Sequence, residues 1–207
     1  MSRVIGLKKT KQFVFVKFDN SITLKIANGF FNKIDLDYDL ELSDSQFSAL
    51  KSSSEKYNAK LTAFRLLSRR QHSSFELKTK LKQRGYSERS IEEIIQELRG
   101  ADYINDFKFA EDFAEEMISK KKNGLQNVLN KLRSMGINNE ILAHVRELYQ
   151  SYDEHEIAFE LAEKKYNSIS GRIDDILIIK FKIYNYLLCK GFSNEVIRKS
   201  IEKLGLS

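Results

Sequence analysis

The chain has 207 residues, of which 42% are hydrophobic and 11% aromatic, and these proportions exclude an intrinsically disordered protein. Lys and Arg outnumber Asp and Glu by 35 to 29, so the net charge of +6 is modest and the positions of the basic residues matter more than their total. No apolar run approaches the roughly 18–20 residues that span a bilayer, and the residues after Met1 lack the apolar stretch of a signal peptide. We therefore expect a cytoplasmic protein that has no membrane partner.

Few residues are arranged for catalysis or for metal binding. Cys189 is the single cysteine, so the chain can form neither an intramolecular disulfide nor a sulfur-based metal cluster. It lies between Leu188 and Phe192, where we expect a buried, unreactive thiol. No P-loop or paired-carboxylate motif is present, and the three histidines lack the spacing of metal ligands: His72, His144 and His155. Neither an enzymatic activity nor a cofactor is expected.

An N-terminal segment has the pattern of a β-hairpin. Gln12–Phe18 is rich in β-branched and aromatic residues, as strands are. Asp19–Ser21 is typical of a turn, because short polar side chains can hydrogen bond to their own backbone. After the turn, Ile22, Leu24 and Ile26 alternate with polar or small side chains. An isolated hairpin is marginally stable in water, so we expect this one to pack on further strands or on helices.

An acidic segment, residues 35–41, has Asp or Glu at every second position. We interpret it as a strand with a solvated, charge-protected face. A calcium-binding loop is the less favoured alternative, because its glycine and glutamate positions hold Leu40 and Gln46. Ser43 begins a capping box and therefore a helix. The serines at 52–54 predict a boundary, which ends an N-terminal β-hairpin region with a short helix at residues 1–52.

A short motif recurs three times after this boundary. Each copy has Leu, three further residues, Gly and a large apolar residue, at Leu81–Tyr86, Leu132–Ile137 and Leu187–Phe192. Glycine tolerates the left-handed conformation just beyond a helix, and the apolar residue that follows can fold back on the helix. We therefore expect a helix to end at each copy. Replacing the glycine by a residue with a β-carbon should cost about 1 kcal/mol.

Amphipathic segments flank each motif, at residues 56–70, 106–121 and 154–167 before it and at helical spacing after it. The pattern predicts a mainly α fold, a tandem repeat of three-helix units in three copies, with a small N-terminal β-hairpin region. The units would occupy residues 55–103, 104–150 and 153–207. One unit is too small to bury its own apolar face, so stacked units should form an elongated, curved array. The alternative is that the three motifs are unrelated helix ends that resemble one another by chance. Three copies in order, with matching amphipathic segments on both sides, argue against it.

Basic residues concentrate on and around the middle helix of each unit. Stacked units would align these clusters into a stripe suited to phosphates, whereas the alternative is that each cluster only solvates an exposed helix face. The predicted nucleic-acid or filament-binding residues are Arg69, Arg70, Lys78, Lys80, Lys82 and Arg84 in the first unit and Lys120, Lys121, Lys122, Lys131 and Arg133 in the second. The third unit adds Lys180, Lys182 and Lys190.

The closing helix of the first unit is acidic instead, with Glu88, Glu92, Glu93 and Glu97. A helix-turn-helix factor would insert this helix into the major groove, where its carboxylates would meet phosphates. We therefore expect binding to single- or double-stranded DNA without sequence specificity. About five phosphate contacts on a single strand would give a salt slope near −3.5.

The same residues carry a family resemblance. Ala63–Arg70, Ser74–Leu81 and Tyr103–Ala110 resemble the first blocks of RecX proteins, and the segment from Asn123 to Ile137 resembles the next block. The resemblance covers about residues 55–207. The sequence departs from the family pattern at two places. Ala101-Asp102 stands where the family commonly has a glycine, and Leu125 stands where it usually has a proline. Both departures affect turn geometry and not charge. Within the Tyr103–Ala110 motif we expect structural roles: a helix cap for Asp106 and core positions for Phe109 and Ala110.

The resemblance implies a protein that lies in the groove of the RecA–DNA filament and modulates, in the direction of inhibition, the recombinase and its ATPase. The associated processes would be DNA repair, homologous recombination and the SOS response. We expect a monomer. Two alternatives are a helical-repeat scaffold for protein interactions without a DNA role, and a general DNA-binding regulator that is not specific for sequence.

Overall fold

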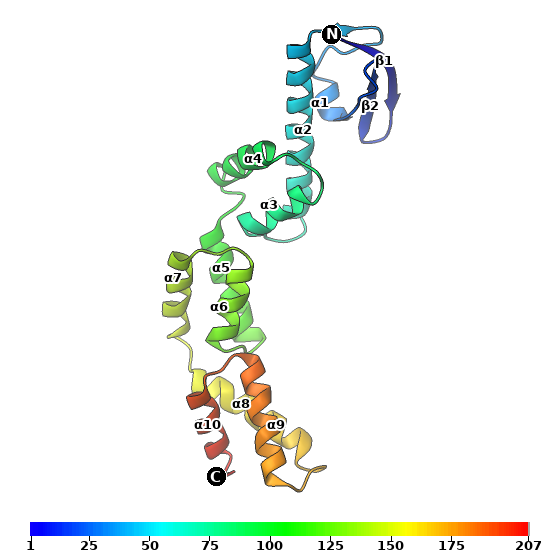
Figure 1. Ribbon diagram of the computed structural model, residues 1–207. Helices are drawn as coiled ribbons and strands as arrows, with labels where there is room; N and C mark the ends of the chain where they lie inside the picture. Colours follow the sequence, from blue (N-terminus) through cyan, green and yellow to red (C-terminus); the bar gives the residue numbers. More distant parts are fainter. Residues whose placement is uncertain (207) are drawn as a thin grey trace. The chain divides into compact units, whose positions relative to one another are not determined.

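The structure is a computed structural model that describes residues 1–206. It is mainly α-helical and divides into two compact units (Figure 1). From here on, the first unit is Met1–Ile104, which includes the first predicted three-helix repeat, and the second unit is Asn105–Ser207, which includes the other two. None of the helices in the described part of the chain combines the length and the hydropathy that crossing a membrane requires.

The first unit opens with a four-stranded antiparallel sheet in the order β3-β2-β1-β4. The predicted hairpin is confirmed: β2 (Phe13–Phe18) pairs with β3 (Thr23–Ala27) across a turn in which Ser21 has a φ of 65°. The sequence interpretation missed β1 (Ser2–Lys9), which pairs with β2. Its alternation is interrupted by Gly6, next to a register shift, so its pattern is weaker than that of β2.

The strand expected over residues 35–41 is wrong for most of its length. Only β4 (Glu41–Leu42) is a strand, and Tyr38 and Asp39 before it form a turn in which Asp39 has a φ of 65°. Short acidic side chains favour such turns because they hydrogen bond to nearby backbone, as Asp37 does with the N–H of Tyr38 at 2.8 Å. The carboxylates therefore do not share a strand face.

A long helix, α2 (Asp44–Leu67), connects the sheet to the first three-helix unit, while the short α1 (Asn28–Phe31) follows β3. The predicted capping box at Ser43 is present. The boundary expected at the serines at 52–54 lies inside this helix, which runs through them without interruption. No Gly or Pro breaks the helix here, and the hydroxyl of Ser54 is satisfied by the carbonyl of Lys51 at 3.0 Å.

The C-terminal half of α2 packs with α3 (Ser74–Lys82) and α4 (Glu88–Gly100). Ala59 and Ala63 of α2 are fully buried against Leu77, Leu81 and the apolar face of α4. These small side chains allow the helices to approach closely, so one buried cluster holds the three helices together.

The second unit contains six α-helices within the described residues, in two groups of three. The first group is α5 (Asp106–Glu115), which continues into a π-helical turn, η1 (Glu116–Lys120), with α6 (Leu125–Ser134) and α7 (Asn139–Tyr149). The second group is α8 (Glu154–Ile169), α9 (Ile176–Lys190) and α10 (Asn194–Lys203). One continuous apolar core joins the two groups.

The beginning of α5 corrects one residue of the sequence interpretation. Asn105, not Asp106, is the N-cap, and its side-chain oxygen accepts hydrogen bonds from the N–H groups of Phe107 and Lys108 at 3.1 and 3.0 Å. Phe109 and Ala110 are buried in the core, as expected. Asn and Asp are equally good N-cap residues, so the sequence alone does not distinguish Asn105 from the adjacent Asp106.

The three recurring glycines have the predicted left-handed backbone, with φ of 82° at Gly85, 75° at Gly136 and 91° at Gly191. In each copy the N–H of the apolar residue after the glycine donates to the carbonyl of the leucine that opens the motif, at 3.1–3.4 Å. This is the Schellman arrangement, and it explains the spacing because the leucine occupies the buried position that the returning chain contacts. The three leucines have no exposed surface: Leu81, Leu132 and Leu187.

A close joint connects the two helix groups of the second unit. The N–H of Gly124, which precedes α6, donates to the carbonyl of Lys190 at the end of α9 at 2.9 Å. The amide of Asn127 donates to the carbonyl of Cys189 at 3.2 Å. The first turn of α6 thus satisfies carbonyls that the end of α9 leaves without helical partners. This brings Gly124 and Gly191 into backbone contact.

Candidate nucleic-acid interface

In the first unit, the acidic helix α4 neutralises two of the six predicted cations. Lys78 and Lys82 of α3 form ion pairs with Glu92 and Glu88, each at 2.6 Å. Two lysines of α2, Lys56 and Lys60, pair in the same way with Glu93 and Glu97. The hydrogen bond from Lys82 lowers the pKa of Glu88, so this carboxylate stays charged opposite its partner. These lysines face carboxylates, which weakens their attraction for phosphate.

The remaining cations of the first cluster differ in their surroundings. Arg70 binds Glu76 through two hydrogen bonds of 3.0 and 2.8 Å, a geometry that holds both side chains in place. Arg69, Lys80 and Arg84 form no ion pair with any residue described by the structure. The guanidinium of Arg84 donates to the carbonyl of Lys80 at 2.7 Å and is exposed. Three of the six predicted cations therefore keep an uncompensated charge.

In the second unit, α6 presents a polar and positive surface. Residues 125–134 contain no Asp or Glu. The exposed side chains of Gln126 and Arg133 both donate to the side-chain oxygen of Asn130 at 2.9 Å. Lys131 is exposed, with its ammonium 3.9 Å from the sulfur of Met117 on η1. Arginine, lysine and amide side chains are the groups that contact phosphate and sugar in protein–DNA complexes.

Further cations gather at the joint between α6 and α9. The ammonium of Lys190 donates to the carbonyl of Lys121 at 3.0 Å, which places a residue of the third cluster beside the second. Lys121 and Lys122 pair with Glu116 and Glu160 at 2.8 and 3.1 Å. Lys120, like Lys131 and Arg133, has no ion pair among residues 1–206. Lys120, Lys131, Arg133 and Lys190 lie on α6 or on the elements packed next to it, and we call this set of cations the α6 surface. Lys131 and Arg133 are two positions apart, so they lie on different sides of the helix.

Near the C-terminus, α9 carries exposed apolar side chains that the sequence interpretation did not single out. Leu177 is 74% exposed and Phe181 66%, and Ile176 and Ile178 beside them are also exposed. The signal was the run of four apolar residues at the start of this helix, since consecutive helical positions cannot all face one core. Lys180 and Lys182 are interspersed, and residues 176–190 contain no acidic residue.

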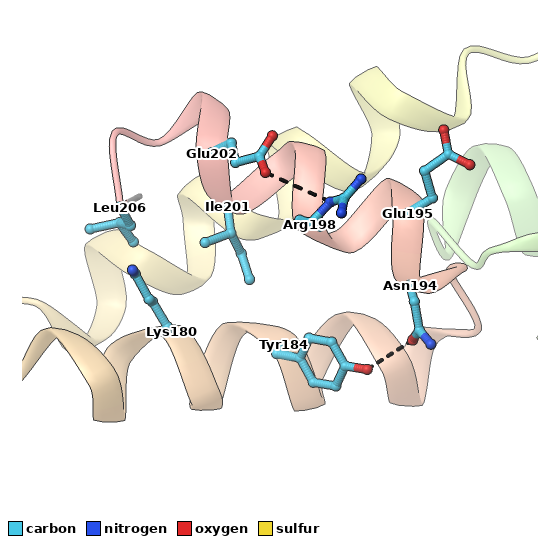
Figure 2. A pocket seen from close by; sticks show the side chains of 8 residues that line it. All are labelled: Lys180, Tyr184, Asn194, Glu195, Arg198, Ile201, Glu202 and Leu206. Atoms are coloured by element: carbon cyan, nitrogen blue, oxygen red, sulfur yellow. Dashed lines mark hydrogen bonds and ion pairs between the residues drawn. The ribbon is translucent and has the colours of Figure 1, made fainter.

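A groove of about 670 Å³ lies between α9 and α10, next to this apolar surface. Figure 2 shows Lys180 and Tyr184 of α9 on one side and Ile201 of α10 on the other. The hydroxyl of Tyr184 donates to the side-chain oxygen of Asn194 at 2.8 Å, which fixes the ring in the wall of the groove. The groove and the exposed residues of α9 provide an apolar area. The border of the groove carries both signs of charge, with Lys180 and Arg198 beside Glu195 and Glu202.

Cys189 is exposed, and the expectation of a buried thiol is wrong. The buried positions of α9 are Ile179, Ile183 and Leu187, each four residues apart. Cys189 follows two residues after the last of them, so it lies on the opposite side of the helix. The apolar neighbours in the sequence concealed this spacing.

A buried histidine couples the first unit to pH. His72 is 5% exposed, and its Nδ1 lies 3.4 Å from Glu76. Burial lowers the pKa of His72, and the charge of Arg70 lowers it further. The folded protein therefore binds this proton less tightly than the unfolded chain, so the stabilising contribution is present above about pH 6.5 and is lost as the pH falls toward the folded pKa.

We expect His72→Gln to reduce the loss of stability between about pH 7 and 5. Urea unfolding at several pH values should give a free energy of unfolding that falls more steeply for the wild-type chain than for this variant. His155→Gln, at an exposed histidine of α8, is the matched control and should keep the wild-type steepness. Equal pH dependence in all three proteins would contradict the assignment.

Comparisons with known proteins agree with this architecture. Models of the first and third three-helix domains of RecX match residues 59–98 and 152–201. The chain is 28% identical to the regulatory protein RecX of Clostridium beijerinckii, over 99% of this chain and 95% of that protein. It is 30% identical to the regulatory protein RecX of Caldanaerobacter subterraneus subsp. tengcongensis, over 97% of this chain and 98% of that protein.

Solved structures give the same result. A crystal structure of a regulatory protein RecX superposes with a TM-score of 0.65, at 21% identity, over 96% of this chain and 98% of that one, which shows a common fold. RecX from Lactobacillus salivarius superposes with a TM-score of 0.64, at 30% identity, over 75% of this chain and 99% of that one. By the full-length similarity and the two matched domains, the chain belongs to the RecX family of regulatory proteins.

Proposed function

We propose that this protein binds the RecA recombinase filament together with its DNA and inhibits strand exchange and ATP hydrolysis. It would act in the cytoplasm, as a monomer, without enzymatic activity or cofactor. The observation that carries the proposal is the α6 surface, whose cations have no carboxylate partner among the described residues and where Arg133 lies beside the amides of Asn130 and Gln126. Such a surface attracts phosphates without reading bases.

The apolar surface at the start of α9 favours a protein partner in addition to DNA. A phosphate backbone offers no apolar surface to contact Leu177 and Phe181, so binding to DNA alone does not explain their exposure. A nucleoprotein filament offers phosphates and protein side chains together. This favours the filament over the two alternatives, a protein scaffold without a DNA role and a general DNA-binding regulator.

The two contributions can be separated by measuring binding to bare single-stranded DNA and to RecA-coated DNA. We expect Leu177→Ser combined with Phe181→Ser to weaken binding to the coated DNA by at least about thirtyfold, since apolar contacts at the centre of an interface each contribute on the order of 1 kcal/mol or more. Binding to bare DNA should be unchanged. Both residues are exposed, so the fold should tolerate the substitutions.

Leu61→Ser, at an exposed leucine of α2, is the control for a general loss of surface hydrophobicity. If the wild-type protein bound bare and coated DNA with equal affinity, the general DNA-binding alternative would replace the proposal. If it bound neither at low salt, the scaffold alternative would.

A further inference from the structure

The outer face of the N-terminal sheet is basic and aromatic. In the antiparallel register, Phe15 of β2 lies directly between Lys8 of β1 and Lys25 of β3. Residues paired in this way have side chains on the same face, about 5 Å apart. Lys17 and Phe13, two residues away on β2, share that face. The opposite face buries Val14 and Val16 with the rest of the sheet's core.

No carboxylate belongs to this face within the described residues. Asp19 is the single acidic residue among the first thirty-four, and it accepts a hydrogen bond from the backbone of Arg3 at the other end of the strands. The cations of β1, β2 and β3 on the outer face, Lys8, Lys17 and Lys25, are exposed and have no ion pair in residues 1–206. The face is therefore positive without internal compensation.

The aromatic rings on this face remain accessible to a ligand. Phe13 and Phe15 are half-buried, and the ammonium of Lys25 lies 4.0 Å from the centre of the Phe13 ring. A cation over an aromatic ring can exchange that contact for a phosphate while a base takes its place on the ring. Exposed aromatics on a sheet, bordered by lysines, are the arrangement on which unpaired bases stack.

The face continues into a groove of about 300 Å³ between β3, α2 and the turn after α3. Phe13 and Lys25 line it from the sheet, and Lys51, Glu55 and Arg84 from the helical side. The carboxylate of Glu55 accepts a hydrogen bond from the N–H of Ser87 at 2.6 Å. Asn58 holds α2 against β3, because its side-chain oxygen accepts from the N–H of Ala27 and its side-chain amide donates to the carbonyl of Lys25. Arg84 was predicted as a binding residue from the sequence, and it lines the same groove as Lys25.

We propose that the outer face of the sheet, with this groove, is a second binding site that takes single-stranded DNA. Bases would stack on Phe15 and Phe13, and phosphates would follow Lys8, Lys17 and Lys25 toward Arg84. The choice of DNA over RNA rests on the function proposed above. The site itself is distinct from the α6 surface and can be tested separately from it.

The test uses the full chain and an oligo(dT) of about 16 nucleotides, within the site sizes of single-strand-binding sheets. The triple variant Lys8→Gln, Lys17→Gln and Lys25→Gln should lower the slope of log affinity against log salt by about 2, at about 0.7 per phosphate contact. Phe15→Leu should weaken binding by at least about fivefold through lost stacking. Phe15→Leu should not change the affinity for a blunt DNA duplex, whose bases cannot reach the ring.

The control is Lys33→Gln, an exposed lysine after α1, away from the outer face. Circular dichroism checks that each variant is folded. Independently of any substitution, an oligonucleotide with photoreactive thymines should crosslink to the peptide that contains Phe15. The proposal fails if crosslinks avoid β2, or if the triple variant and Lys33→Gln change the affinity equally. Because the variants of the α6 surface are measured on the same oligonucleotide, failure of one site does not obscure the other.

Discussion

Gly191→Ala is expected to destabilise the second unit by about 3 kcal/mol, well above the cost of the same change at an unpacked helix end. Two effects combine at this glycine. Its φ of 91° is unfavourable for alanine, and a Cβ here would lie 2.5 Å from the Cβ and 2.6 Å from the backbone nitrogen of Asn127. The backbone of α6 cannot move aside without breaking the joint with α9. Urea unfolding measures the change in the free energy of unfolding.

Two other glycines separate these effects. Gly85 has a φ of 82° but nothing within 4 Å of an added Cβ, so Gly85→Ala should cost only the backbone term of about 1–2 kcal/mol. Gly124 has an ordinary φ of −70°, but its added Cβ would lie 2.5 Å from the carbonyl oxygen of Gly191. Gly124→Ala therefore reports the steric term alone. Equal losses at Gly85 and Gly191 would contradict the close joint.

Neutralising the α6 surface is expected to weaken binding to single-stranded DNA on the order of a hundredfold at about 0.1 M salt. The variant is Lys120→Gln, Lys131→Gln and Arg133→Gln, which removes three cations that have no carboxylate partner among the described residues. The salt slope should fall by about 2, because each lost phosphate contact removes about 0.7. Fluorescence anisotropy over a salt series measures both quantities.

The matched control removes three cations that are already paired: Lys78→Gln, Lys82→Gln and Lys121→Gln. The net charge changes by the same amount, yet the affinity should fall much less because carboxylates already offset these charges. Surface ion pairs stabilise the fold little, so the control should remain folded. If the control lost as much affinity as the α6 variant, total charge and not the α6 surface would govern binding.

The repeated architecture could be predicted from the sequence because it depends on local chemistry. The leucine, the glycine and the apolar residue of each motif interact within one helix end, so their spacing is fixed by hydrogen bonds between near neighbours. The hairpin of β2 and β3 followed for the same reason. By contrast, β1 is defined by its partner strand, and its own residues give a weak pattern.

The site could be predicted only as a set of cations. Which of them keep an uncompensated charge depends on packing between helices, since Lys78 and Lys82 meet glutamates of another helix, α4, 14 and 6 residues further along the chain. The contact between Lys190 and Lys121 is of the same kind and joins two clusters that appeared separate. Cys189 is different, because the spacing of the buried residues in α9 already placed it outward.

Action on the RecA filament is measured by the ATPase activity of RecA on single-stranded DNA while this protein is added below the RecA concentration. Action on the filament predicts a strong decrease in the rate at substoichiometric ratios, because one molecule bound to the filament affects many RecA subunits. A rate that falls only when the protein is in excess and coats the DNA, or a rate that does not change, would contradict it.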